Sequence, residues 1–309
     1  MPIHIARRLT EVASRIILGK ERAVRLALAC VLARGHLLIV GGGSQPDALV
    51  TRFVELAGGR GRARIAVVPM ASEEPRETGE EKAVQLREFG ADAVVLNLTR
   101  AEAADSAVAA RLEGITGIWF TGGDQVPLAR VLQDTPVLRA MRRRYREGAV
   151  VGGTSAGAAI MGDSMLTGNQ RRPDSLGYYG DEFPEIAPGV IEVVPGLGFL
   201  PGIIVDQHFV RRERHNRLLA VILERPTLLG AGIDEGTALE VGPEGRWRVL
   251  GRGAVVVYDA RRAGRAAPDG PLGVTGLMLH LLPPGSRYDP VTGRATLPPA
   301  PATAGSRSP

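Results

Sequence analysis

The stretch over residues 149–159 constrains the fold of this chain more than any other. It reads Ala-Val-Val-Gly-Gly-Thr-Ser-Ala-Gly-Ala-Ala. Its first residues are typical of the end of a buried strand, and residues 156–161 are small and apolar enough to begin a packed helix. Ser155 lies at the turn between them, among residues with little or no side chain. A strand that turns sharply into a helix needs this composition, because its strained backbone passes close to its neighbours.

The same turn is suited to a catalytic nucleophile. Its letters Gly-Thr-Ser-Ala-Gly fit the outer Gly-x-Ser-x-Gly pattern of a nucleophile elbow. The helix that follows aims its free N–H groups and its dipole at negative charge developing near Ser155. An ordinary Gly-rich strand-to-helix turn has the same letters. The catalytic interpretation therefore depends on a base, an acid and an oxyanion hole elsewhere in the chain.

Short apolar segments alternate with amphipathic helical ones on both sides of this turn. We expect strands at residues 36–40, 64–70, 93–98, 117–121, 149–153, 203–206 and 228–233, and helices at 47–58, 79–90, 101–112, 126–147 and 212–224. Such alternation predicts an α/β fold, a mostly parallel sheet with helices on both faces. Added antiparallel strands are expected near the C-terminus, at residues 239–241 and 246–258, and residues 163–190 are expected to form a long excursion.

The domain organisation follows from the same pattern. Residues 1–35 have helical spacing and form a predicted N-terminal helical extension, a candidate packing arm or dimer contact. Residues 36–290 form one predicted catalytic α/β domain. Residues 291–309 form a predicted disordered tail, because their last dozen positions are rich in Pro, Ala, Gly and Ser. We expect a homodimer.

Composition and charge exclude several classes of protein. The chain has 309 residues and a formal net charge of +5, with its basic residues spread along its length, so no nucleic-acid partner is expected. Cys30 is the single cysteine, which excludes an internal disulfide and a cysteine metal cluster. A run of about 18 apolar residues is absent and no secretory pattern opens the sequence. These features predict a cytoplasmic protein without a membrane segment.

A serine nucleophile needs a base, and His208 is the best candidate. It closes the predicted strand at residues 203–206, at the sheet edge where Ser155 is expected. Surface or packing roles account for the other histidines, which are His4, His36, His215 and His280. Two pairs of carboxylates are candidates for the acid that orients the base. Asp206 and Glu213 are near His208 in the sequence, and Asp234 and Glu235 close a later strand.

An oxyanion hole needs two backbone donors aimed at one point. Ala156 follows the nucleophile directly and is expected to supply one N–H group. The turn Gly122-Gly123-Asp124 is expected to supply the second, through Gly123, because missing side chains let the backbone approach a substrate.

A set of motifs in a fixed order resembles the cyanophycinases, which belong to a family of serine peptidases that also includes aspartyl dipeptidase. The likeness runs from about residue 36 to about residue 290. The motifs are Gly41-Gly42-Gly43, Thr121-Gly122-Gly123-Asp124-Gln125, Gly153-Thr154-Ser155-Ala156-Gly157-Ala158, Asp206-Gln207-His208-Phe209 with Arg212, Arg214 and Arg217, and Gly232-Ile233-Asp234-Glu235.

The resemblance implies a fold like that of class I glutamine amidotransferases, with serine in place of their cysteine. It implies Ser155 as nucleophile, His208 as base and Glu235 as the orienting acid. The implied reaction is hydrolysis of cyanophycin, an aspartate backbone carrying arginine on each side-chain carboxyl, to β-Asp-Arg dipeptides through an acyl-enzyme. The residues implied in substrate binding are Gln125, Asp206, Gln207, Arg212, Arg214, Arg217 and Glu192.

This substrate fits the residue types, because arginines bind carboxylates in bidentate pairs and acidic groups bind a guanidinium. Two other functions stay open: a related serine dipeptidase acting on other aspartyl peptides, and a non-enzymatic binding module on the same scaffold. No cofactor is expected. His208 and His215 lack a third metal ligand nearby, and Gly41-Gly42-Gly43-Ser44-Gln45 lacks the lysine and hydroxyl residue of a phosphate loop.

Overall fold

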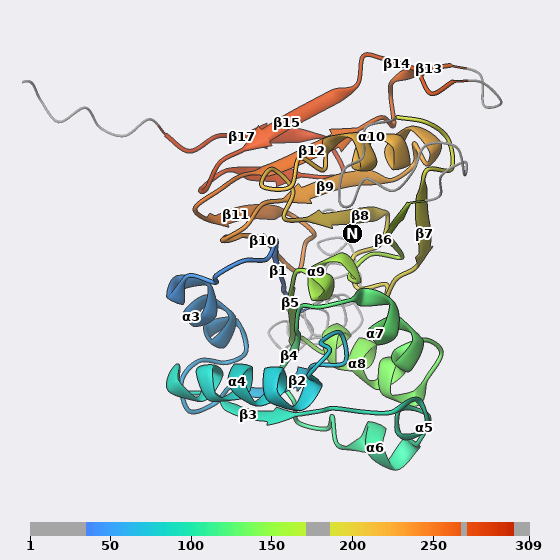
Figure 1. Cartoon of the computed structure of the whole chain (residues 1–309). Helices are drawn as coiled ribbons and strands as arrows, with labels where there is room; N and C mark the ends of the chain where they lie inside the picture. Colours follow the sequence, from blue (N-terminus) through green and yellow to red (C-terminus); the bar gives the residue numbers. More distant parts are fainter. Residues whose placement is uncertain (1–34, 171–185, 267–270, 300–309) are drawn as a thin grey trace, which may run out of the picture.

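A computed structural model describes residues 35–170, 186–266 and 271–299 of the chain (Figure 1). The predicted helical extension lies outside the described residues except for Gly35, and so does the chain beyond residue 299. Within the described ranges, no helix is long and apolar enough to cross a membrane.

A nine-stranded mixed sheet forms the centre of the molecule, in the order β17-β16-β11-β10-β1-β5-β4-β2-β3. The last five strands in this order, β1-β5-β4-β2-β3, pair in parallel. They are β1 (Leu37–Val40), β2 (Arg64–Val68), β3 (Asp92–Val95), β4 (Gly117–Phe120) and β5 (Val150–Thr154). The other half pairs antiparallel and consists of β10 (Thr237–Val241), β11 (Trp247–Gly251), β16 (Arg287–Asp289) and β17 (Arg294–Thr296). The chain therefore has the α/β fold that the sequence predicts, including the added antiparallel strands.

Helices cover both faces of the parallel half (Figure 1). They are α3 (Asp47–Leu56), α4 (Pro75–Glu88), α5 (Arg100–Ala103), α6 (Ser106–Ala110), α7 (Gln125–Leu132), α8 (Pro136–Arg146) and α9 (Ala156–Ala159). The single helices predicted at 101–112 and 126–147 are wrong, because capping residues divide each of them. The Asp105 side chain accepts from the backbone N–H of Ala107 to begin α6. Thr135 accepts from the N–H of Leu138 to begin α8, with Pro136 next in the chain.

A second sheet, in the order β15-β12-β9-β8, packs against the first. Its strands are β8 (Ile203–Gln207), β9 (Leu229–Ile233), β12 (Val255–Asp259) and β15 (Met278–Leu282), and α10 (His215–Glu224) covers it. Two hairpins complete the described chain: β6 (Ser164–Gln170) with β7 (Ile191–Pro195), and β13 (Gly264–Arg265) with β14 (Val274–Thr275). The excursion predicted after Gly162 thus opens as strand β6. His208 follows a strand of the second sheet, so its predicted place at the edge of the central sheet needs correction.

Strand alternation places the cores between these layers. Leu37 and Ile39 of β1 join the core that the two sheets share, together with Val205 of β8. Leu38 of β1 packs on the opposite side, in the core that contains α3 and α4, and Ile204 of β8 packs toward α10. Both sheets are therefore buried on two faces near the ends of β1, β5 and β8.

The predicted tail needs a correction at its start. Residues Arg294–Thr296 form β17, which pairs with β16 at the edge of the central sheet. The prediction of disorder from residue 291 is therefore wrong for this strand. Its composition is poor in apolar residues, but backbone hydrogen bonding to an exposed sheet edge does not require them.

Candidate active site

Ser155 lies at a strained turn between β5 and α9. Its backbone has φ 54° and ψ −116°, a conformation that residues with a side chain rarely adopt. Two close approaches hold the turn in this shape. A Cβ on Gly153 would lie 2.4 Å from the carbonyl oxygen of Gly157, and one on Gly157 would lie 2.3 Å from the carbonyl oxygen of Phe120. The elbow expected from the sequence is therefore present, and its flanking glycines are required by packing.

Ser155, His208 and Glu235 form a continuous chain of side-chain contacts. Ser155 Oγ is 3.0 Å from His208 Nε2, and His208 Nδ1 is 2.6 Å from Glu235 Oε1. His208 follows β8 and Glu235 follows β9, so two neighbouring parallel strands bring the base and the acid together. Asp234, the alternative that sequence reasoning left open, accepts instead from the backbone N–H of Arg211 at 3.0 Å. This arrangement has the hydrogen-bond geometry of a nucleophile, base and orienting acid.

The carboxyl end of β1 joins the segments that carry these three side chains. The carbonyl oxygen of Val40 accepts from the N–H of Ser155 at 3.1 Å, and that of Gly41 accepts from the N–H of His208 at 2.7 Å. The carbonyl oxygen of Gly42 accepts from the N–H of Gly236, directly after Glu235, at 3.0 Å. Three consecutive carbonyl groups therefore fix the backbone positions of the nucleophile, the base and the acid.

Gly42 and Gly43 also contact the base and the acid directly. A Cβ on Gly42 would lie 2.3 Å from His208 Nε2, and one on Gly43 would lie 3.0 Å from Glu235 Oε2. Both glycines have positive φ, of 108° and 68°. Sequence reasoning used this loop as part of a family motif and to exclude a phosphate loop, and it assigned the loop no role in the active site. The absence of side chains in a loop after the first strand was the available signal.

Burial and hydrogen bonding act in opposite directions on the base. Burial lowers the pKa of His208 below its usual range, and the hydrogen bond that its ring donates to Glu235 partly opposes this by favouring the imidazolium. The hydrogen bond to His208 lowers the pKa of the Glu235 carboxyl. The site thus holds a neutral imidazole beside an ionised carboxylate near neutral pH, which is the protonation state that a general base needs.

Of the two expected oxyanion donors, Ala156 follows Ser155 in the chain and Gly123 follows Gly122, which lies against Ser155. Ala156 begins α9, and Gly122, next to Gly123, lies so close that a Cβ on it would be 3.4 Å from Ser155 Cβ. Within the part of the chain that the structure describes, neither the N–H of Ala156 nor that of Gly123 has a hydrogen-bond acceptor. Gly123 must be glycine, because a Cβ there would lie 1.9 Å from the carbonyl oxygen of Ala71.

A buried charged cluster lies behind the base. Asp206 is fully buried and accepts two hydrogen bonds from the buried guanidinium of Arg217, one of them from Nε at 2.6 Å. Arg214 Nη1 donates to the carbonyl oxygen of Gln207 at 2.7 Å. Asp206 and Arg217 thus bind each other, and contact of either group with substrate stays a prediction. Their geometry supports a positioning role for the segment that carries His208.

The other residues expected to bind substrate have varied surroundings. Gln207 is buried, and its Oε1 has no hydrogen-bond partner among the described residues. Gln125 is also buried and donates to the carbonyl oxygen of Leu166 at 2.6 Å. Glu192 accepts from Thr167 and Asn169 on the β6–β7 hairpin. Arg212 is exposed, and its charge lowers the pKa of His208. Contact of these four residues with substrate stays a prediction.

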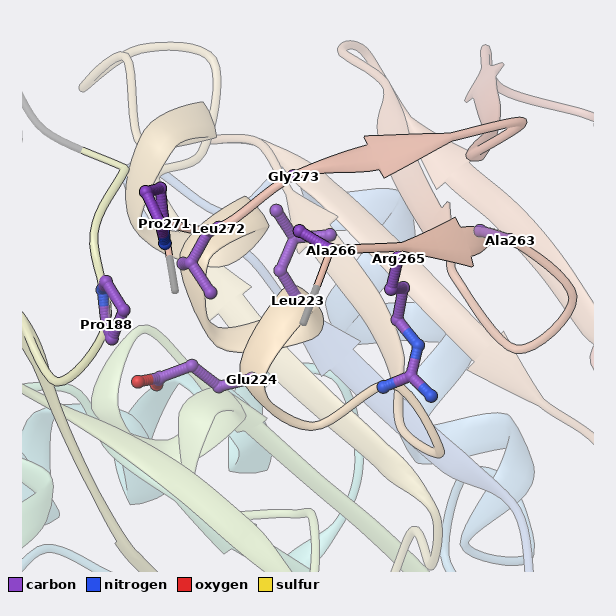
Figure 2. A pocket seen from close by; sticks show the side chains of 9 residues that line it. All are labelled: Pro188, Leu223, Glu224, Ala263, Arg265, Ala266, Pro271, Leu272 and Gly273. Carbon is purple, nitrogen blue, oxygen red and sulfur yellow. The ribbon is translucent and has the colours of Figure 1, made fainter. Parts of the chain in front are cut away.

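The described surface has more than one hollow. Figure 2 shows a cavity of about 510 Å³ where the end of α10 faces the β13–β14 hairpin, lined by Leu223, Glu224 and Arg265 among others. Its lining contains none of the predicted site residues. A cavity of about 390 Å³ is lined by Gly122 and Thr154, which adjoin the nucleophile. Within the described ranges, no group of three or more His, Cys, Asp or Glu side chains is arranged to hold a metal ion.

Changing Glu235→Gln tests the role of the acid. We expect kcat to fall by about 10²-fold to 10⁴-fold, because the amide no longer stabilises the imidazolium. Since Glu235 raises the pKa of His208, its loss should also move the acid limb of the kcat/KM profile to lower pH. Glu213→Gln, on the loop that carries His208 but without a hydrogen bond to its ring, is the matched control. A larger loss in the control than in the Glu235 variant would contradict the assignment.

Comparisons with known proteins agree with this geometry. The model of peptidase family S51 matches residues 37–246. A cyanophycinase from Geminocystis herdmanii is 36% identical over 267 residues, covering 83% of this chain and 94% of that protein. A cyanophycinase from Synechococcus elongatus is 35% identical and covers 83% of this chain and 79% of its own. A peptidase structure from an acI-B1 actinobacterium shares the fold, with a TM-score of 0.57, 22% identity, and coverage of 80% of this chain and 98% of that one.

Proposed function

Because the chain belongs to peptidase family S51 and is a peptide hydrolase, we propose that it cleaves cyanophycin to β-Asp-Arg dipeptides by serine catalysis. Ser155 is the proposed nucleophile, His208 the base and Glu235 the orienting acid. The observation that carries the catalytic part is the continuous chain of contacts from Ser155 Oγ through His208 to Glu235 Oε1. The substrate is proposed from relatives that share 35–37% of their residues and are cyanophycinases.

The proposed reaction has two steps. His208 Nε2 removes the proton from Ser155 Oγ as that oxygen attacks a backbone carbonyl carbon of the substrate. The N–H groups of Ala156 and Gly123 stabilise the oxyanion, and His208 then gives the proton to the leaving amine as the peptide bond breaks. Water attacks the resulting ester with His208 as base again, which releases the acyl product and restores the Ser155 hydroxyl.

The charges around the site suit this substrate. Each cyanophycin unit carries a guanidinium and a free carboxylate. Arg212 is exposed on the loop after His208 and offers a partner for a carboxylate. Glu192 on β7 offers one for a guanidinium. An enzyme for other aspartyl peptides would need fewer such partners, so that second function has weaker support.

Incubation with purified cyanophycin tests this proposal. We expect β-Asp-Arg to accumulate as the main product, identified by mass. Release from an equal amount of Asp-X dipeptides should be slower by about 100-fold, which corresponds to the loss of one charged hydrogen bond of about 3 kcal/mol. Equal or faster cleavage of the Asp-X dipeptides would identify the dipeptidase alternative. Intact polymer after prolonged incubation would refute the proposed substrate.

A further inference from the structure

Lys82 is a buried lysine in a chain that uses arginine almost everywhere else. Only two of the 38 basic residues are lysines, and the side chain of this one, on α4, lies inside the molecule at 8% exposure. Its Nζ lies 4.3 Å from the ring centroid of Trp119, over the face of the indole. An ammonium in such a place is costly unless an anion or several acceptors compensate for the lost water.

The acceptors in the protein compensate for Lys82 only in part. Its Nζ donates to Gln45 Oε1 and to Gln85 Oε1, both at 2.7 Å. An ammonium has three donors, so the third has no acceptor oxygen among the described residues and meets only the face of the Trp119 ring. Among the described residues no carboxylate lies within ion-pair distance of it. Burial lowers the pKa of Lys82 to about 7, and a bound anion would favour the charged form again.

A second buried polar group, the hydroxyl of Thr121, lines the same cavity as Lys82 and lacks a hydrogen-bond partner among the described residues. Thr121, at the end of β4, is 3% exposed, and its Oγ1 has no hydrogen-bond partner in the described structure. Both Thr121 and Lys82 line the cavity of about 390 Å³ that Gly122 and Thr154 also line. Buried polar groups of this kind are normally hydrogen-bonded, so an unpartnered hydroxyl beside an incompletely satisfied ammonium indicates a ligand with acceptor oxygens.

The position of the cavity identifies the ligand. Gly122 lies against Ser155, where a Cβ on the glycine would be 3.9 Å from Oγ. A molecule in this cavity therefore contacts Gly122 and Thr154, the residues that adjoin the nucleophile. We propose that Lys82 and Thr121 form a carboxylate-binding subsite that holds a free carboxylate of the substrate unit at the scissile bond. This inference rests on the proposed function, since it takes the ligand to be the peptide that the enzyme cleaves.

Such a subsite would explain how an exopeptidase recognises a chain end. A terminal unit carries a main-chain carboxylate that inner units lack, and every unit carries the carboxylate of its arginine. Either group could be the one bound, because both present the same oxygens. Glu81, the other charged residue among those described on the cavity wall, is exposed, so solvent screens its repulsion of the ligand.

Binding to the Ser155→Ala protein tests the subsite without turnover. Calorimetry would measure the affinity of a trimer of β-Asp-Arg units, with Lys82→Met or Thr121→Val added to this background. We expect Kd to rise about 10-fold to 100-fold for Lys82→Met, the size of effect expected for a charged hydrogen bond, and about 5-fold for Thr121→Val. The melting temperature of Thr121→Val should not fall, because its hydroxyl has no partner to lose. Arg76→Met, an exposed cation on the same helix, is the control.

Two modified trimers identify the carboxylate. One carries a C-terminal amide and the other carries arginine amide in its terminal unit. The trimer whose amide replaces the bound carboxylate should bind more weakly than the acid. Its Kd should then be the same with and without Lys82→Met. An unchanged Kd in Lys82→Met, absence of trimer binding to the Ser155→Ala background, or an equal Lys82→Met effect on the acid and on both amides would overturn the subsite. If native enzyme does not cleave the trimer while Lys82-dependent binding persists, the proposed activity fails and the subsite stands.

Discussion

Replacement of Ser155 by alanine should abolish peptide hydrolysis and leave the fold intact. We expect kcat to fall by about 10⁴-fold to 10⁶-fold, because the base then has no alcohol to activate. The melting temperature should change little, since the variant keeps the Cβ at the strained turn and loses only the contact from Oγ to His208. Dipeptide release from cyanophycin, followed by mass, is the measurement, with circular dichroism as the check on folding.

A serine-directed phosphonate probe gives a second readout of the same residue. In the native protein the probe should add its mass to the peptide that contains Ser155, and His208→Ala should slow this labelling. Ser44→Ala, which removes an exposed hydroxyl from the neighbouring loop, is the control and should behave as the native protein does. Undiminished hydrolysis in Ser155→Ala, or labelling that is confined to another residue, would mean that this serine is not the nucleophile.

Replacement of Gly42 by alanine should disable the enzyme, although Gly42 itself carries no group that reacts. The added Cβ would lie 2.3 Å from His208 Nε2 and 2.4 Å from Cε1, so the ring must leave its present position 3.0 Å from Ser155 Oγ. Geometry errors of about 1 Å at a reacting centre cost about 100-fold or more in rate. We therefore expect kcat to fall by about 10²-fold to 10³-fold, with a smaller change in KM.

The backbone at Gly42 adds a stability cost that must be separated from this effect. Its φ of 108° is strained for any residue with a side chain, at about 1–3 kcal/mol. Gly148→Ala is the matched control, because Gly148 has φ 104° and open space where its Cβ would be. Both variants should unfold at lower denaturant concentration, and only Gly42→Ala should lose activity. Equal losses of activity would show that strain, rather than displacement of His208, is responsible.

Local patterns were enough to predict much of the active-site architecture. The small residues around Ser155 predict an elbow because few other sequences can make that turn. The parallel strands could be predicted because they are buried on both faces and give continuous apolar runs, as in β1 and β4. The split of the helix at residues 126–147 was missed. Its break depends on a threonine cap at Thr135, which a search for apolar spacing overlooks.

The sequence by itself determined the parallel α/β half of the fold, the elbow, and the short list of polar residues at strand ends. Residue type and position left Asp234 and Glu235 as equal candidates for the acid, because adjacent residues at a strand end differ only in which way the backbone turns them, and only the family resemblance implied Glu235. Only the tertiary structure decided which carboxylate meets His208, that β8 belongs to a second sheet, and that Gly42 is packed against the base. These are contacts between segments far apart in the chain, and their distances depend on how the two sheets pack, for which no single segment carries a signal.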